Sequence, residues 1–332
     1  MAYVGFGVWA IVTQQLTSQI IFTGILWFTV KWRPKFIFSI ERLSSLFSYS
    51  WKLVASTLIY TFYTNIQSLF IGKFFNPAIL GFYSRGMQLP NMLVSNINDS
   101  IQSVMFPALA SQQDNLYRIK EMVRRAIVTS SFIIFPMMIG LAMIAEPLVE
   151  ILFTEKWLPI VPFLQIFCCY YALWSIDTAN LQAIKALGRS DIFLKLEILK
   201  CLIGIFILII SVPFGIYVMT LGVLVNRVIS VIIDAFPNKY LINYGFMEQF
   251  KDTIPSILLS LVMGVIVYSV REIGFADIFT ILIQIGIGIV SYVGLAKLFK
   301  IECYTFLVFS LKNMIHSKKE RISWNNLKEE EV

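Results

Sequence analysis

Apolar runs of about twenty residues follow one another along most of the chain, with short polar stretches between them. A helix of about 20 apolar residues spans the hydrocarbon core of a bilayer. The pattern therefore predicts an all-α polytopic membrane protein with about nine transmembrane helices. The expected spans are residues 4–30, 51–72, 81–108, 127–145, 159–184, 198–214, 216–236, 253–270 and 277–297.

Composition agrees with a membrane protein. Of the 332 residues, 58% are hydrophobic and only 14% are charged, with a mean hydropathy of +0.75, whereas a soluble domain carries about 25% charged residues. The four cysteines lie in or beside apolar stretches without metal-binding spacing, and the single histidine, His316, lies in the polar tail. We therefore expect no metal and no cofactor.

Basic residues between the predicted spans are strongly asymmetric. Twenty lysines and arginines fall in one set of alternate loops and in the tail, while the other set holds only Lys73, Lys156 and Arg271. The positive-inside rule then predicts a cytoplasmic C-terminus and an N-terminus on the outside. This asymmetry accounts for the net charge of +7, so no nucleic-acid partner is expected.

The beginning of the chain is unusual for a protein with this orientation. Met1 stands directly before an apolar span, and the positive n-region of a signal peptide is missing. We therefore expect the chain to be the C-terminal piece of a longer protein. Two amphipathic segments, 32–50 and 302–316, are expected at the membrane interface. The first is either a connector between two helix bundles or a solvated loop.

Span 81–108 carries an unusual number of polar residues. On a helical wheel they occupy an arc of roughly 160° at about 100° per residue. Because charges at the bilayer centre cost several kcal/mol, this arc faces either a polar network between helices or a hydrophilic cavity. Ten polar groups exceed what helix packing requires, so we favour a substrate cavity. Its expected lining from this helix is Arg85, Gln88, Asn91, Asn96, Asp99 and Gln102.

Other spans contribute further polar side chains. Asn65 and Gln67 in span 51–72 form a second, weaker polar set, and Arg227 in span 216–236 is either cavity lining or a structural arginine. Asp177 in span 159–184 is a candidate ion or proton site, with a structural buried carboxylate as the alternative. Lys200 and Glu197 are expected to pair locally.

Catalytic signatures are missing from the sequence. It contains no G-x-x-x-x-G-K-[ST] motif for a nucleotide-driven engine. It also lacks a nucleophile paired with a base, and the longest outside stretch, 146–158, is short for a membrane-embedded polymerase or ligase. The sequence therefore indicates a transport conduit rather than an enzyme.

Several stretches resemble one known family. They are "GFGVWAIVTQQLTSQIIFTGILWFTVKWRP", "SWKLVASTLIYTFYTNIQSLFIGKFFNPAILGFYSRGMQLPNMLVSNINDSIQSVMFPALA", "AEPLVEILFTEKWLPIVPFLQIF" and "AIKALGRSDIFLKLE". The chain resembles the polysaccharide-exporter (Wzx-type) flippases over most of residues 1–300. It lies nearest the lipopolysaccharide, O-antigen and colanic-acid branch of the multidrug/oligosaccharidyl-lipid/polysaccharide exporter superfamily.

The resemblance implies two helix bundles around a central cavity in the bacterial inner membrane. It implies alternating access that moves undecaprenyl-pyrophosphate-linked oligosaccharide to the periplasmic face, with membrane lipids and other polysaccharide-assembly proteins as partners. Arg85 or Arg227 would neutralise the pyrophosphate, and amides would bind sugar hydroxyls. A cation-coupled antiporter like the multidrug extruders, and an inactive truncated remnant, remain alternatives.

The predicted spans and the resemblance together predict the domain boundaries. Residues 1–31 would be the last helix of an incomplete N-terminal bundle, followed by a cytoplasmic amphipathic linker over 32–50. A C-terminal bundle of six helices would occupy 51–236, two additional helices 237–300, and an amphipathic segment with a charged tail 301–332.

Overall fold

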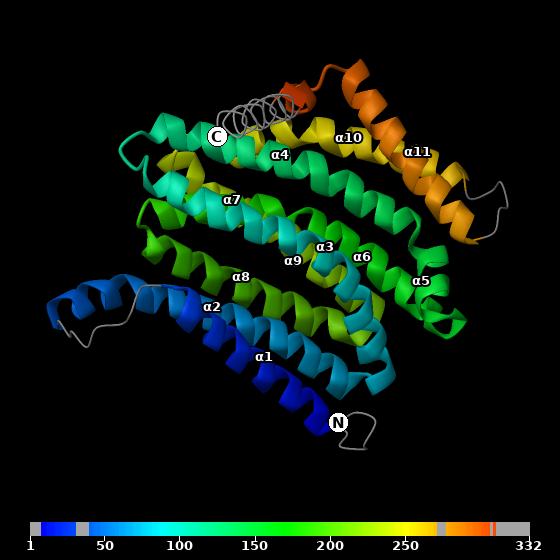
Figure 1. Cartoon of the computed structure of the whole chain (residues 1–332), viewed down its shortest axis with the longest axis horizontal. Helices are drawn as coiled ribbons and strands as arrows, with labels where there is room; N and C mark the ends of the chain where they lie inside the picture. The colour runs from blue at the N-terminus through cyan, green and yellow to red at the C-terminus, as the bar shows by residue number, and fades with distance from the viewer. Residues whose placement is uncertain (1–7, 31–39, 271–276, 306–307, 310–332) are drawn as a thin grey trace, which may run out of the picture. The chain divides into compact units, whose positions relative to one another are not determined.

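The computed structural model describes residues 8–30, 40–270, 277–305 and 308–309, and every regular element within them is helical (Figure 1). The all-α fold class predicted from the sequence is therefore confirmed. The elements are α1 (Val8–Thr29), α2 (Ile40–Phe74), α3 (Pro77–Ala110), α4 (Leu116–Met143), α5 (Ala145–Phe153), η2 (Glu155–Ile160), α6 (Val161–Ala172), α7 (Trp174–Ala186), α8 (Ser190–Ser211), η3 (Val212–Phe214), α9 (Ile216–Leu241), α10 (Phe246–Val270) and α11 (Asp277–Leu298).

The predicted spans overlap these helices, although α2, α4 and α8 begin several residues before the predicted bounds. Within the described residues, five helical stretches are long and apolar enough to cross a membrane. They are Leu116–Met143, Glu155–Ala186, Ile216–Leu241, Phe246–Val270 and Phe279–Leu298. α8 is outside this set and carries four charged residues, Asp191, Lys195, Glu197 and Lys200. The count of nine transmembrane helices stays a prediction.

One predicted span, 159–184, is divided in the structure. It forms α6 and α7, which are separated at Leu173. The division places Asp177 in the first turn of α7, where the helix dipole stabilises a negative charge. Residues 146–158, predicted as an outside stretch, lie for the most part in the short elements α5 and η2.

The described chain divides into two compact units, residues 1–47 and 48–332. The first contains α1 and the beginning of α2, so residues 40–47 of the predicted linker are helical. Residues 1–7, 31–39 and 310–332, which include parts of the predicted first span, linker and tail, lie outside the described residues.

In the second unit the helices form a layered bundle. α4 packs against α10, α3 packs against both α6 and α7, and α8 packs against α9 (Figure 1). The larger apolar core lies among α3, α4, α6 and α7, and includes Phe163, Phe167 and Met138. A methyl group at Gly86 would lie 2.7 Å from Phe163 Cβ, so the missing side chain allows α3 to approach α6 closely.

A second apolar cluster joins α11 to α4 and α10. Pro136 lies inside α4 and has no N–H, so it leaves the carbonyl of Phe132 without its helical donor. The hydroxyl of Tyr292 in α11 donates to this carbonyl over 2.8 Å. Gln284 Nε2 donates to the carbonyl of Val267 in α10 over 3.0 Å. Polar contacts therefore fix α11 against two neighbouring helices.

Candidate functional site

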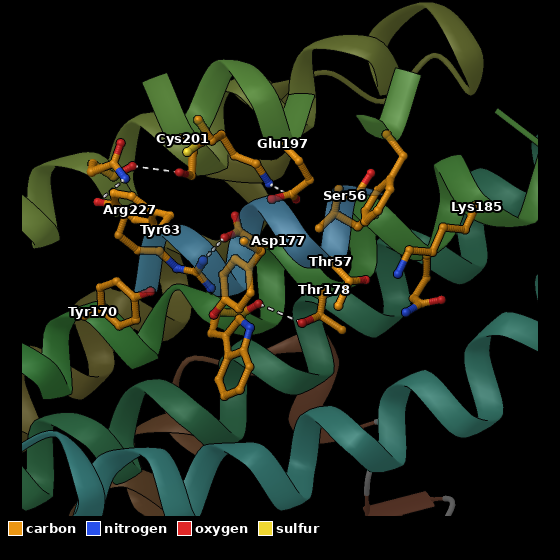
Figure 2. Close-up of a pocket in the computed structure, with 18 of the residues that line it drawn as sticks. Ser56, Thr57, Tyr63, Tyr170, Asp177, Thr178, Lys185, Glu197, Cys201 and Arg227 are labelled. Carbon is orange, nitrogen blue, oxygen red and sulfur yellow. Dashed lines mark hydrogen bonds and ion pairs between the residues drawn. The ribbon is translucent and has the colours of Figure 1, made fainter. Parts of the chain in front are cut away.

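A polar cavity lies inside the second unit, between α2, α7, α8 and α9 (Figure 2). Its volume is about 300 Å³. Tyr60 and Tyr63 line it from α2, Asp177 from α7, Lys200 from α8 and Arg227 from α9. In a membrane-embedded bundle such a concentration of ionisable side chains indicates function.

A polar stripe along α9 forms one wall of the cavity. Asn226, Ser230 and Asp234 recur every four residues and are all buried. Residues four apart lie on the same face of a helix, so this spacing directs them to one side. Arg227 lies beside the stripe and is also buried.

Arg227 forms an ion pair with Asp177. Its Nη1 lies 2.5 Å from Asp177 Oδ2, and the two side chains are 9% and 3% exposed. The guanidinium also lies over the ring of Tyr170, with Cζ 5.0 Å from the ring centroid (Figure 2). A buried ion pair with an aromatic neighbour holds the guanidinium in one place.

Lys200 lies between two carboxylates. Its Nζ is 2.6 Å from Glu197 Oε1 and 2.9 Å from Asp234 Oδ2. The local pairing of Lys200 with Glu197 predicted from the sequence is therefore confirmed. Asp234 had no assigned role in the sequence analysis, and it connects α8 to the stripe on α9.

Two further hydrogen bonds join helices that line the cavity. Asn226 Nδ2 donates to the Tyr63 hydroxyl over 3.0 Å, which joins α9 to α2. Gln182 Nε2 donates to Gln102 Oε1 over 3.1 Å, which joins α7 to α3. Gln102 is thus the predicted cavity residue of α3 that also lines this pocket.

Several polar atoms of the lining residues are buried without a hydrogen-bond partner within the described part of the chain. They are Arg227 Nε and Nη2, Asp177 Oδ1 and Asn226 Oδ1. An unpaired buried polar group costs about 1–3 kcal/mol, and a charged group costs more. The cavity therefore has unused donors and acceptors in its wall.

The polar residues of α3 mostly lie outside this cavity. Arg85, Gln88, Asn96 and Asp99 are exposed, and Asn91 is half-buried. Their interactions are local: Arg85 Nη1 donates to Gln88 Oε1 over 2.7 Å, and Asn96 Nδ2 donates to the carbonyl of Met92 over 2.8 Å. Such side chains remain available to a ligand.

The two predicted residues of α2 point in different directions. Asn65 is exposed and donates to the carbonyl of Thr61 over 2.8 Å. Gln67 is buried, and its Oε1 accepts a long hydrogen bond of 3.4 Å from Tyr83. Neither lines the pocket, so the structure brings together only Gln102, Asp177 and Arg227 of the predicted site residues.

Aromatic residues of the cavity had no assigned role in the sequence analysis. Tyr60, Tyr63, Tyr170 and Trp174 all line it. Their helical spacing could have identified two of them, because Ser56, Tyr60 and Tyr63 follow one another at intervals of four and three residues on α2. The sequence places them on one face together with a polar residue.

Known sequences match the chain along much of its length. A family described as "Polysaccharide biosynthesis protein" matches residues 1–162. The teichuronic acid biosynthesis protein TuaB of Bacillus subtilis is 26% identical over 251 residues, which cover 74% of this chain and 52% of TuaB. The lipopolysaccharide biosynthesis protein WzxC of Escherichia coli is 24% identical over 244 residues, covering 71% and 50%.

Two further matches are a transport protein and a solved flippase structure. The succinoglycan biosynthesis transport protein ExoT of Rhizobium meliloti is 22% identical over 195 residues, covering 58% of this chain and 39% of ExoT. The solved structure of the lipid II flippase MurJ in an inward closed conformation shares the fold, with a TM-score of 0.64 at 18% identity, over 87% of this chain and 60% of MurJ. The chain spans about half the length of the curated relatives TuaB and WzxC. These matches confirm the resemblance predicted from the sequence.

Proposed function

We propose that this chain, a member of the polysaccharide exporters and flippases of the multidrug/oligosaccharidyl-lipid/polysaccharide exporter superfamily, supplies the C-terminal bundle of a flippase. The flippase moves undecaprenyl-pyrophosphate-linked oligosaccharide across the bacterial inner membrane by alternating access through a polar central cavity. The C-terminus of the chain is cytoplasmic in this proposal.

The exposed polar face of α3 carries the proposal. α3 has 34 residues and is about 51 Å long at about 1.5 Å per residue, so it is long enough to cross a bilayer. Arg85, Gln88, Asn96 and Asp99 are exposed on it within the part of the chain that the structure describes. Contact with lipid would be energetically unfavourable for these polar and charged groups. A hydrated passage that carries a glycan would keep them solvated.

The chemistry of this face suits both polar parts of the proposed substrate. Arg85 is exposed, and its guanidinium could bind a pyrophosphate through two parallel hydrogen bonds. Asn91 and Asn96 offer amide donors and acceptors to sugar hydroxyls. The relatives TuaB, WzxC and ExoT bear names of polysaccharide biosynthesis, which supports a glycan as cargo. No step requires catalysis by the protein.

Asp177 is proposed as the ion or proton site of the transport cycle. It is buried on α7 and paired with Arg227. Protonation of Asp177, or binding of a cation to it, would weaken this pair and free the guanidinium. The ion pair therefore offers a way to connect the charge state of the cavity to the packing of α7 against α9.

Reconstitution of the full-length gene product in liposomes tests the function. Undecaprenyl-pyrophosphate-linked oligosaccharide is placed in the inner leaflet, and a lectin outside measures the glycan that appears. We expect the wild-type protein to expose the glycan much faster than protein-free liposomes. Arg85→Gln should slow exposure about 10-fold or more, because a hydrogen bond to a charged group contributes about 1.5–3 kcal/mol.

Arg189→Gln is the matched control. Arg189 is an exposed arginine directly before α8 that pairs with Asp191, and it is not among the residues that line the cavity, so its loss should leave the rate unchanged. Glycan exposure at the protein-free rate would refute the flippase. Export of a cationic drug in exchange for cations, without glycan exposure, would instead establish the multidrug-extruder alternative.

A further inference from the structure

The unpaired atoms of the cavity wall include both donors and acceptors. Arg227 retains two donor nitrogens, Nε and Nη2, while Asp177 Oδ1 and Asn226 Oδ1 are acceptors, all without a hydrogen-bond partner in the described part of the chain. A phosphodiester anion or a carboxylate only accepts hydrogen bonds, so it could satisfy Arg227 but would repel Asp177. A hydroxyl both donates and accepts, so a hydroxylated ligand can satisfy all of these atoms.

The charges of the cavity favour a neutral ligand. Lys185, Lys200 and Arg227 contribute three basic groups. Asp177 and Glu197 line the cavity, and Asp234 contacts Lys200, so three acidic groups balance them. Adding an anion would leave this buried site with an unbalanced negative charge, which is expensive in a low-dielectric interior.

The shape and the aromatic residues favour a ring. Tyr170 lies next to Arg227, at the end of the cavity opposite Lys185 (Figure 2), and Trp174 also lines it. Aromatic faces provide an apolar surface for the C–H face of a sugar. The volume of about 300 Å³ stands at the lower end of ligand pockets, which measure about 300–1,000 Å³. It suits a single sugar ring better than an oligosaccharide.

We infer that this cavity inside the C-terminal bundle binds one neutral sugar residue through two neighbouring hydroxyls. Arg227 donates from Nε and Nη2 to the two hydroxyl oxygens, and Asp177 and Asn226 accept from the hydroxyl hydrogens. The inference rests on the proposed function, since it places a glycosyl unit of the substrate in this cavity. It assigns Arg227 to the sugar, whereas the pyrophosphate is left to Arg85.

Saturation-transfer NMR on the purified full-length gene product in detergent tests this inference. The probes are a panel of neutral methyl glycosides with two neighbouring hydroxyls, their deoxy analogues that lack one of these hydroxyls, and inorganic phosphate as competitor. We expect at least one methyl glycoside to receive saturation and its deoxy analogue to bind at least tenfold more weakly. Phosphate in tenfold excess should not displace the glycoside.

Two substitutions of the same kind locate the binding. Arg227→Lys keeps a positive charge beside Asp177 but removes the two-donor edge, so glycoside binding should weaken at least tenfold. Arg124→Lys is the matched control, because Arg124 forms an ion pair with Asp252 at 3.0 Å outside the cavity. It should bind the glycoside like the wild type.

The opposite results overturn the inference. Displacement by phosphate would make the cavity an anion site, and lack of saturation for every glycoside would mean that water alone fills it. Equal binding of glycoside and deoxy analogue by the wild-type protein would reject the role of neighbouring hydroxyls even if Arg227→Lys fails to fold. Glycan exposure in the liposome assay without glycoside binding would reject this inference alone. Glycoside binding without glycan exposure would reject the proposed function alone.

Discussion

The ion pair between Asp177 and Arg227 should dominate the stability of the cavity. The two side chains are 3% and 9% exposed, so solvent can compensate little when one partner is removed. Breaking a buried pair costs about 3–5 kcal/mol, because the remaining charge is left alone. We therefore expect Asp177→Asn and Arg227→Met each to lower the free energy of unfolding by about 3–5 kcal/mol.

The double variant with Asp177→Asn and Arg227→Met tests whether the two single substitutions act through the same ion pair or independently. With both charges removed, a buried amide remains, and its cost is about 1–3 kcal/mol. The double variant should therefore be more stable than the sum of the singles predicts, by about 3 kcal/mol or more. Denaturant titration in mixed micelles, followed by tryptophan fluorescence, measures these free energies.

A second cycle provides the control. Arg124 and Asp252 also form an ion pair at 3.0 Å, but their side chains are 33% and 19% exposed. Their coupling should be smaller, nearer the 0–1 kcal/mol of exposed pairs. If the Asp177 and Arg227 effects add to within about 0.5 kcal/mol, the buried pair does not exist as described.

Two further predictions concern packing. Gly86→Ala should destabilise the bundle by about 1 kcal/mol, because the overlap of the new methyl group with Phe163 Cβ at 2.7 Å costs about 1–3 kcal/mol and the gain in helix propensity is about 1 kcal/mol. Gly81→Ala in the same helix is the control: its methyl group meets no atom within 4 Å, so it should stabilise the bundle. Equal shifts of the two variants in a thermal melt would contradict the overlap at Gly86. Tyr292→Phe should cost about 1–3 kcal/mol, since it leaves the buried carbonyl of Phe132 unpaired; an unchanged denaturation midpoint would show that the carbonyl finds another donor.

The helices were predictable because long apolar runs require helical backbone in a bilayer. The division of span 159–184 at Leu173 was not, since that stretch reads as a single apolar run. The exposed polar face of α3 was predictable from the helical periodicity of its polar residues alone. Asn98, another polar residue of span 81–108, is an exception, because the structure buries it completely.

The cavity was less accessible to sequence reasoning. Asp177 and Arg227 are fifty positions apart, and only the crossing of α7 and α9 brings them together. From the sequence alone, the two residues belong to separate predicted spans, and nothing in either span indicates their pairing. The buried spacing of Asn226, Ser230 and Asp234 was visible in the sequence and would have indicated which side of α9 faces its neighbours. It could not have indicated which neighbours those are.

The two polar regions of the bundle differ in how firmly their side chains are held. On α3, the hydrogen bond that Arg85 makes within the described residues goes to Gln88 of its own helix, so under the proposed function it could exchange partners as a substrate passes. In the cavity, Arg227 is held by a carboxylate and an aromatic ring, which suits recognition in one fixed geometry. Gln102 belongs to both regions, because it lies on the polar arc of α3 and accepts from Gln182 in the cavity wall. A movement of α3 during transport would therefore alter the hydrogen bonds of the cavity directly.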